Sequence, residues 1–148
     1  MYRLGALLLL AWSLVATAQA QRPATLMLAC KGTAISSSNP KDVGDPKSGE
    51  DPMTEPVSMG IIINFTTRAV QGFGYPGYVD YPVTIKGAND VKIVFDGQQS
   101  GGLTNSIIGS LDRVTGELLA TSSVIGPKGN TLTATTYTLQ CKPTQRMF

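Results

Sequence analysis

Short runs of β-branched and apolar residues, separated by Gly, Asn, Asp and Pro, are the feature of this 148-residue chain that most restricts its fold. Such runs are typical of strands, and helix signals are almost missing. Apolar and polar residues often alternate within them, so that Val91, Ile93 and Phe95 would share one face of a strand. Strands are predicted over residues 25–32, 57–65, 68–73, 81–86, 91–96, 106–113, 117–125 and 131–141.

The connections between the later strands are too short to hold a helix that returns the chain to a parallel neighbour. Residues 87–90, 113–116 and 126–130 each contain Gly within a turn of this kind. We therefore expect an all-β antiparallel meander. About seven or eight strands in this length suit either a small closed barrel or a two-layer sandwich, and closure would leave no sheet edge exposed.

The start of the chain predicts export. Arg3 precedes an apolar run over residues 4–15, and small residues ending at Ala20 complete the layout of a removable signal peptide. The run is shorter than the ~20 residues that a membrane-spanning helix needs. We expect a signal peptide at 1–20, a single β domain at 21–148, a periplasmic or secreted location, and no stable membrane insertion after signal removal.

The two cysteines, Cys30 and Cys141, lie near opposite ends of the exported part. Thiols are oxidised to disulfides outside the cytoplasm, so these two are predicted to form one disulfide bond between the first and last strands. On the chain-entropy model such a bridge stabilises the fold by about 4–5 kcal/mol. The alternative is a lipid-modified Cys30, which would leave Cys141 unpaired.

Charge and residue types restrict the function. The chain has 12 Lys and Arg against 10 Asp and Glu, which disfavours a dedicated nucleic-acid binder because such proteins carry a dense basic stripe. It has no His, and no recognised signature of a serine nucleophile occurs in the exported part. We therefore expect no catalytic residue, no cofactor and no metal site. An unrecognised hydrolase with dispersed Ser, Thr or carboxylate groups is the remaining enzymatic alternative.

The segment at 36–56 is rich in Pro, Ser and Asp, a composition that keeps a chain solvated. It is predicted to be a flexible loop. Its carboxylates fit no calcium-binding loop, because the Asp-x-Asp-x-Asp-Gly spacing is missing. Whether this loop has a function is left open.

The segment from Gly72 to Tyr81 is the best binding candidate. Glycines make a loop adaptable, and aromatic rings offer large contact faces at low rotamer entropy, a combination that recognition loops use. The alternative is that the rings fold over one end of the barrel and plug it. The predicted binding residues are Phe73, Tyr75, Tyr78 and Tyr81, and residues 98–105 form a neighbouring loop that is expected to assist.

The turn from Asp112 to Glu117 carries three charges within six residues. Asp112 and Arg113 point to opposite sides of a regular strand, so they are not expected to pair with each other. Gly116 is expected to supply the positive φ of the turn.

Three short segments carry a resemblance. Leu-Ala-Cys-Lys-Gly-Thr at 28–33, Leu-Asp-Arg-Val-Thr-Gly at 111–116 and Leu-Gln-Cys-Lys-Pro at 139–143 look like small uncharacterised exported proteins of Gram-negative bacteria. That resemblance implies an envelope or secreted setting and brings no activity or site residues with it. The general plan is also similar to periplasmic lysozyme inhibitors of the C-type class, but the segment at 100–104 lacks the aromatic residue of their Ser-Gly-x-x-Tyr motif.

Together these observations favour an exported, non-catalytic binding module that contacts an envelope protein or a glycan. The alternative is a small carrier that holds an apolar ligand in the barrel interior, provided that the barrel does not fill this space with its own side chains.

Overall fold

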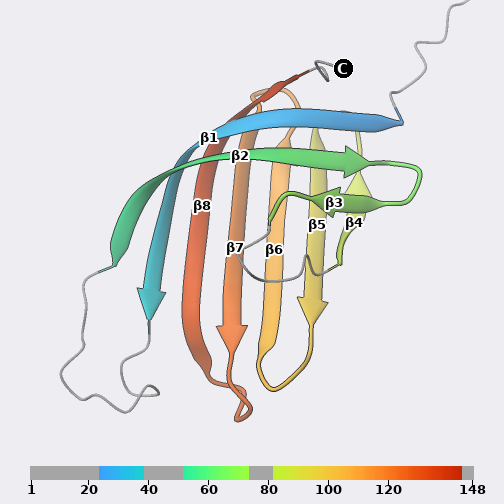
Figure 1. The fold of residues 1–148 in the computed structure, drawn as a ribbon. Coiled ribbons are helices and arrows are strands. Elements are labelled where there is room, and N and C mark those ends of the chain that lie inside the picture. Colours follow the sequence, from blue (N-terminus) through green and yellow to red (C-terminus); the bar gives the residue numbers. More distant parts are fainter. Residues whose placement is uncertain (1–23, 39–51, 74–81, 145–148) are drawn as a thin grey trace, which may run out of the picture.

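The computed structural model describes residues 24–38, 52–73 and 82–144, so the predicted signal peptide lies outside it. The described residues form eight antiparallel strands that follow one another around a closed barrel (Figure 1). This confirms the expected all-β meander and selects the barrel over the sandwich. The strands are β1 (Thr25–Ser38), β2 (Met53–Asn64), β3 (Ala69–Gln71), β4 (Val83–Ala88), β5 (Lys92–Gln99), β6 (Thr104–Asp112), β7 (Glu117–Ile125) and β8 (Thr131–Pro143).

The barrel closes where β1 pairs with β8, and the disulfide lies at this seam. Cys30 is the direct register partner of Cys141, their Cα atoms are 4.0 Å apart, and 111 positions separate them in sequence. The backbone N–H of Cys141 donates to the carbonyl oxygen of Gly116. The main chain of Cys141 therefore faces β7, which makes Cys30 and Cys141 a non-hydrogen-bonded pair, whose side chains stand closest together. The disulfide confirms the predicted bridge and indicates a non-cytoplasmic environment.

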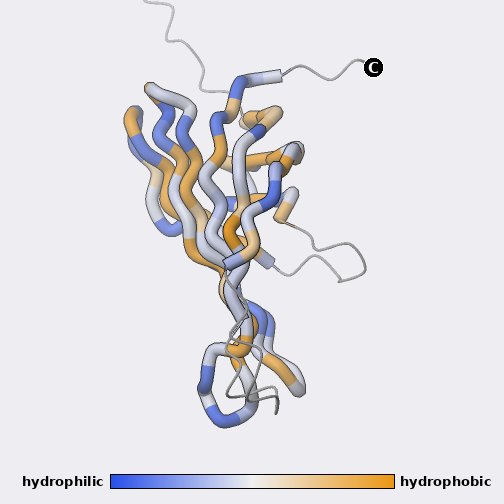
Figure 2. The backbone as a smooth tube through the Cα atoms, turned by 90° about the vertical axis from the view of Figure 1, so that its left-hand side faces the viewer, coloured by the Kyte–Doolittle hydropathy of each residue, from blue (hydrophilic) through white to orange (hydrophobic). Residues whose placement is uncertain are grey.

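Alternation along the strands builds the core. Hydrophobic and hydrophilic residues alternate along parts of the chain in Figure 2, as strands with one buried face require. The buried apolar residues of the strands form one core cluster. Phe95 is completely buried at the centre of this cluster, between Ile85 on β4 and Gly109 on β6, which are its register partners. The largest fully buried neighbours are Ile61, Ile63, Ile93, Leu111, Leu118 and Leu139.

The strands beside β3 pair over very different lengths. β3 pairs with β2 only at Ile62–Asn64, whereas β1 pairs with β2 along Met53–Asn64. Among the described strands, the first part of β2 therefore has β1 as its one partner. Pro56 lies in that part, where its missing N–H falls on the edge away from β1 and interrupts no ladder bond.

The predicted loop at 36–56 is shorter than its composition suggests. Its first residues, Ser36–Ser38, continue β1 opposite β8, and its last ones, 53–56, begin β2. Ser36 Oγ lies 3.0 Å from Thr135 Oγ1. A cross-strand partner satisfies the hydroxyl there, so a serine-rich stretch that reads as solvated is part of the sheet. Residues 39–51 lie outside the described ranges.

Candidate functional site

Phe73 is the predicted binding residue that the structure describes. It is half-buried, and its ring centroid lies 5.3 Å from that of Phe95 and 6.3 Å from that of Tyr137. Its ring packs against the barrel core, as the plugging alternative requires of it. Tyr75, Tyr78 and Tyr81 lie outside the described residues, so their role in binding stays a prediction.

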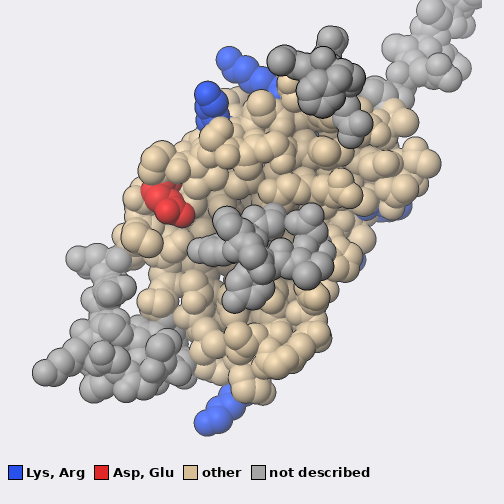
Figure 3. Space-filling view, viewed as in Figure 1, with Lys and Arg blue, Asp and Glu red and all other residues tan. Residues whose placement is uncertain are grey.

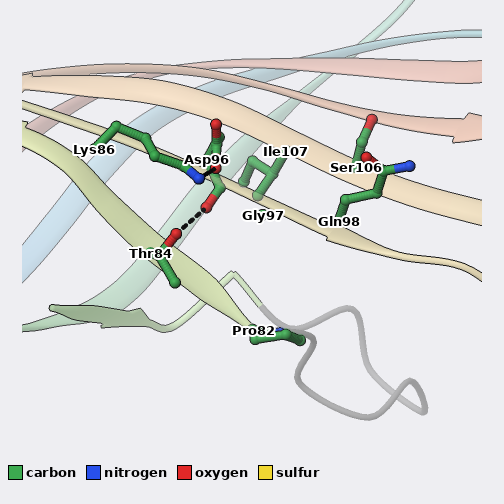
Figure 4. A pocket seen from close by; sticks show the side chains of 8 residues that line it. All are labelled: Pro82, Thr84, Lys86, Asp96, Gly97, Gln98, Ser106 and Ile107. Atoms are coloured by element: carbon green, nitrogen blue, oxygen red, sulfur yellow. Dashed lines mark hydrogen bonds and ion pairs between the residues drawn. The ribbon is translucent and has the colours of Figure 1, made fainter. Parts of the chain in front are cut away.

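A pocket of about 440 Å³ lies on the outer surface where β4, β5 and β6 adjoin (Figure 4). Gly97 follows Asp96, and Ile107 follows Ser106; both Gly97 and Ile107 are buried and face the interior. Successive side chains of a strand point to opposite faces. Asp96 and Ser106 therefore face outward. The lining residues are Pro82, Thr84, Lys86, Asp96, Gly97, Gln98, Ser106 and Ile107.

Gly97 sets the shape of the pocket wall. A β-carbon at this position would stand 2.5 Å from the carbonyl oxygen of Pro82 and 2.9 Å from the Cα of Val83. Only a residue without a side chain lets the start of β4 approach β5 this closely. The close approach brings Pro82 to the rim beside Gln98 and Thr84, where all three line the pocket.

The two charged groups of the pocket pair with each other. Lys86 Nζ lies 3.0 Å from Asp96 Oδ1, and their side chains are 57% and 44% exposed. The Thr84 hydroxyl donates to the carbonyl oxygen of Asp96 over 3.4 Å. Such an exposed pair contributes little to stability. Because the two charges are opposite, the pocket is close to electrically neutral.

Two uncharged polar groups lie at the other side of the pocket. Gln98 and Ser106 are direct register partners on β5 and β6, and their side chains lie next to each other in the close-up (Figure 4). The Gln98 amide offers donors and an acceptor, and the Ser106 hydroxyl offers one donor and acceptor lone pairs. The pocket therefore presents both hydrogen-bond donors and acceptors to a ligand.

Two lining residues are close in sequence to the segments that are predicted for binding. Pro82 directly follows Tyr81 in the chain, and Gln98 begins the predicted loop at 98–105. Sequence reasoning missed Lys86, Asp96 and Ser106. Alternation along β5 could have placed Asp96 on the outer face, but which residues stand beside it follows from the registers of β4 and β6, which no local pattern shows.

The turn after β6 is built as expected. The backbone N–H groups of Val114 and Thr115 donate to Asp112 Oδ1 over 2.8 and 2.9 Å. These two hydrogen bonds lower the pKa of the Asp112 carboxyl, and the bond from Thr115 has the larger effect. Gly116 has a φ of 78°, as predicted. Arg113 points away from Asp112 and donates to the carbonyl oxygen of Asn89 over 2.7 Å. The side chains of Asp112 and Arg113 therefore each bind the local backbone.

On the face shown in Figure 3, Lys and Arg side chains lie singly near the margins. Within residues 24–38, 52–73 and 82–144, no three or more His, Cys, Asp or Glu side chains gather in a way that could hold a metal ion. No helix in the described part of the chain is long and apolar enough to cross a membrane.

No protein-family model, curated protein or solved structure matches this chain.

Proposed function

We propose that this protein is an exported, non-catalytic binding module of the periplasm or the extracellular space, and that it holds an envelope protein or a glycan at the pocket between β4, β5 and β6. The observation that most supports the proposal is the position of this pocket. Its lining includes Pro82, which immediately follows the aromatic segment at 72–81 in the chain, and Gln98, where the second predicted loop begins.

The chemistry of the pocket favours binding over catalysis. On the side of the pocket where Gln98 lies, Ser106 carries the one hydroxyl among the lining residues. A serine nucleophile needs a base to take its proton. The charged groups in the lining are Lys86 and Asp96, which are bound to each other. Their pairing favours a role in holding a ligand, since neither is aimed at Ser106.

Two features support export. The first twenty residues have the layout of a signal peptide, and the protein carries a buried disulfide between its first and last strands. Both favour an oxidising compartment, and the disulfide accounts for both cysteines of the chain.

The interior gives less support to the apolar-carrier alternative. Phe95, Leu118 and Ile93 are completely buried where a carrier would need space for its ligand. The ring of Phe73 adds to this set from the side of β3. A filled interior directs a ligand to the surface of the barrel.

A capture experiment tests the proposal. The mature protein is immobilised and exposed to an envelope extract of the cells that produce it, as wild type, as Gln98→Ala with Ser106→Ala, and as Gln140→Ala with Ser110→Ala. The control pair uses the same residue types at strand positions that lie outside the pocket lining and outside both predicted binding segments. We expect the wild type and the control to retain a ligand that the pocket variant loses. Equal retention by all three proteins would place the ligand elsewhere.

The aromatic segment is tested separately. Tyr75→Ala with Tyr78→Ala is expected to weaken capture of the same ligand, because the rings would contribute contact area next to the pocket. A ligand that binds this variant as tightly as the wild type removes the tyrosines from the site and leaves the pocket residues in it.

A further inference from the structure

We infer that the pocket between β4, β5 and β6 recognises a neutral, polyhydroxylated ligand, that is, a saccharide unit rather than a charged group or a peptide side chain. This inference rests on the proposed function and narrows it, because it selects a glycan over an envelope protein. It is drawn from the charges, the hydrogen-bonding groups and the size of the pocket.

The first support is charge. Lys86 and Asp96 are the charged side chains of the lining, and their atoms lie 3.0 Å apart, so each neutralises the other. An anionic ligand would have to compete with Asp96 for the ammonium group, and a cationic one with Lys86 for the carboxylate. A neutral ligand faces neither cost, because it leaves the ion pair in place.

The second support is the mixture of donors and acceptors. The Lys86 ammonium keeps donors beyond the one directed at Asp96, and a carboxylate accepts more hydrogen bonds than this single pair uses. Gln98 and Ser106, which are register partners, add an amide and a hydroxyl on the other side. Sugar hydroxyls both donate and accept, so a ring between the two sides can satisfy both kinds of group.

The third support is size and the presence of apolar contact. About 440 Å³ falls in the range of small-molecule sites, about 300–1,000 Å³. Pro82 is exposed and lines the pocket, and the carbon atoms of its ring can contact the C–H face of a sugar ring. Polar edges with an apolar wall suit an amphiphilic ring.

The direct test is an NMR titration of the full mature chain. The probes are four neutral disaccharides, namely maltose, lactose, mannobiose and N,N′-diacetylchitobiose. The cationic probe is deacetylated chitobiose and the anionic probe is digalacturonate. We expect at least one neutral probe to shift the backbone amides of Gly97, Gln98 and Ser106 in a saturable way. Its affinity should change less than about twofold between about 0.01 and 1 M ionic strength, because no charge is exchanged.

Variants sharpen this test. Gln98→Ala removes hydrogen bonds to the ligand and should weaken binding of the neutral probe about fivefold, while Gln140→Ala, at an exposed strand position outside the lining, should leave it within about twofold. Lys86→Met leaves Asp96 unpaired, and this variant should prefer the cationic probe. Asp96→Asn leaves Lys86 unpaired and should prefer the anionic probe. Both shifts follow from removing one half of the ion pair.

The outcomes separate the inference from the proposed function. If no neutral probe shifts the pocket amides and the envelope ligand lost by Gln98→Ala with Ser106→Ala is a protein, the saccharide inference is overturned while the binding module stands. A wild-type protein that prefers a charged probe at the pocket overturns it as well. If the pocket amides respond to no probe and the capture experiment does not distinguish its variants, both fail together.

Discussion

The ring of Phe95 on β5 occupies the space that a β-carbon at Gly109 on β6 would need. The two residues are direct register partners, and a β-carbon at position 109 would stand 2.5 Å from Phe95 Cζ and 2.8 Å from the Cβ of Ala120. A glycine and an alanine on neighbouring strands therefore make room for the largest fully buried side chain of the barrel. This complementarity is what fills the interior.

Gly109→Ala should destabilise the protein by about 1–3 kcal/mol, because the added methyl group overpacks the site against a ring that has no space to move into. The measurement is the free energy of unfolding in urea. Phe95→Leu reduces the ring to a smaller side chain, so Gly109→Ala should cost less in that background than in the wild type. Equal costs in both backgrounds would show that the ring and Gly109 do not interact.

Cys30→Ala with Cys141→Ala should lower the free energy of unfolding by about 4–5 kcal/mol on the chain-entropy model, since the bridge closes a loop across 111 sequence positions. Urea unfolding of the oxidised wild type and of this double variant gives the difference. The side chains are buried, so the alanine variant also reports a small loss of packing. An unchanged unfolding midpoint would mean that strand pairing alone closes the barrel.

Arg68→Met should destabilise the protein by about 1.5–3 kcal/mol. β4 has a register shift between Ile85 and Gly87, and the Arg68 guanidinium donates to the carbonyl oxygens of Ile85, over 2.6 and 3.2 Å, and of Lys86, over 3.3 Å. Methionine keeps the unbranched part of the side chain, as far as the position of Nε, without the donors of the guanidinium group. Lys128→Met, in the exposed turn before β8, is the control and should stay within about 0.5 kcal/mol of the wild type in urea unfolding.

Asp112 predicts an acid-dependent loss of stability. Its pKa is lowered in the folded state by the N–H donors of Thr115 and Val114, so the stability that the charge contributes is present above the ordinary carboxyl range and lost as the pH falls through the lowered pKa. The wild type should therefore exceed Asp112→Asn in unfolding free energy at neutral pH, and the difference should shrink below about pH 4. A difference that stays constant into strong acid would contradict this account of the turn.

Much of the fold could be predicted from the sequence because the signals for strands and turns lie within short segments of the chain. The strand over Glu117–Ile125 is the predicted one to the residue, since Gly116 and Gly126 bound it on both sides. The prediction fails where tertiary partners decide. The composition of Ser36–Ser38 predicts a loop, yet these residues pair with β8. In β4, pairing with β5 resumes after the bulge, so that the strand ends at Ala88 and not at residue 86 as predicted.

The candidate site was predicted less well, for a geometric reason. The sequence predicts Phe73 as an aromatic contact residue for a ligand, whereas its ring contacts Phe95 and Tyr137 of the barrel. Lys86 and Asp96 carry no motif, and they meet only because Thr84, two residues before Lys86, is the register partner of Asp96. Cross-strand neighbours of this kind are set by register, which a single sequence specifies weakly.

Competition for the envelope ligand tests the pocket assignment most directly. Unlabelled Gln98→Ala and Gln140→Ala proteins are each used to displace labelled wild-type protein from the envelope material that it binds, and the concentration for half displacement is measured. The account predicts that Gln140→Ala competes as the wild type does and that Gln98→Ala requires about five times more protein, the cost of about 1 kcal/mol of hydrogen bonding. Equal half-displacement concentrations for the two variants would contradict it.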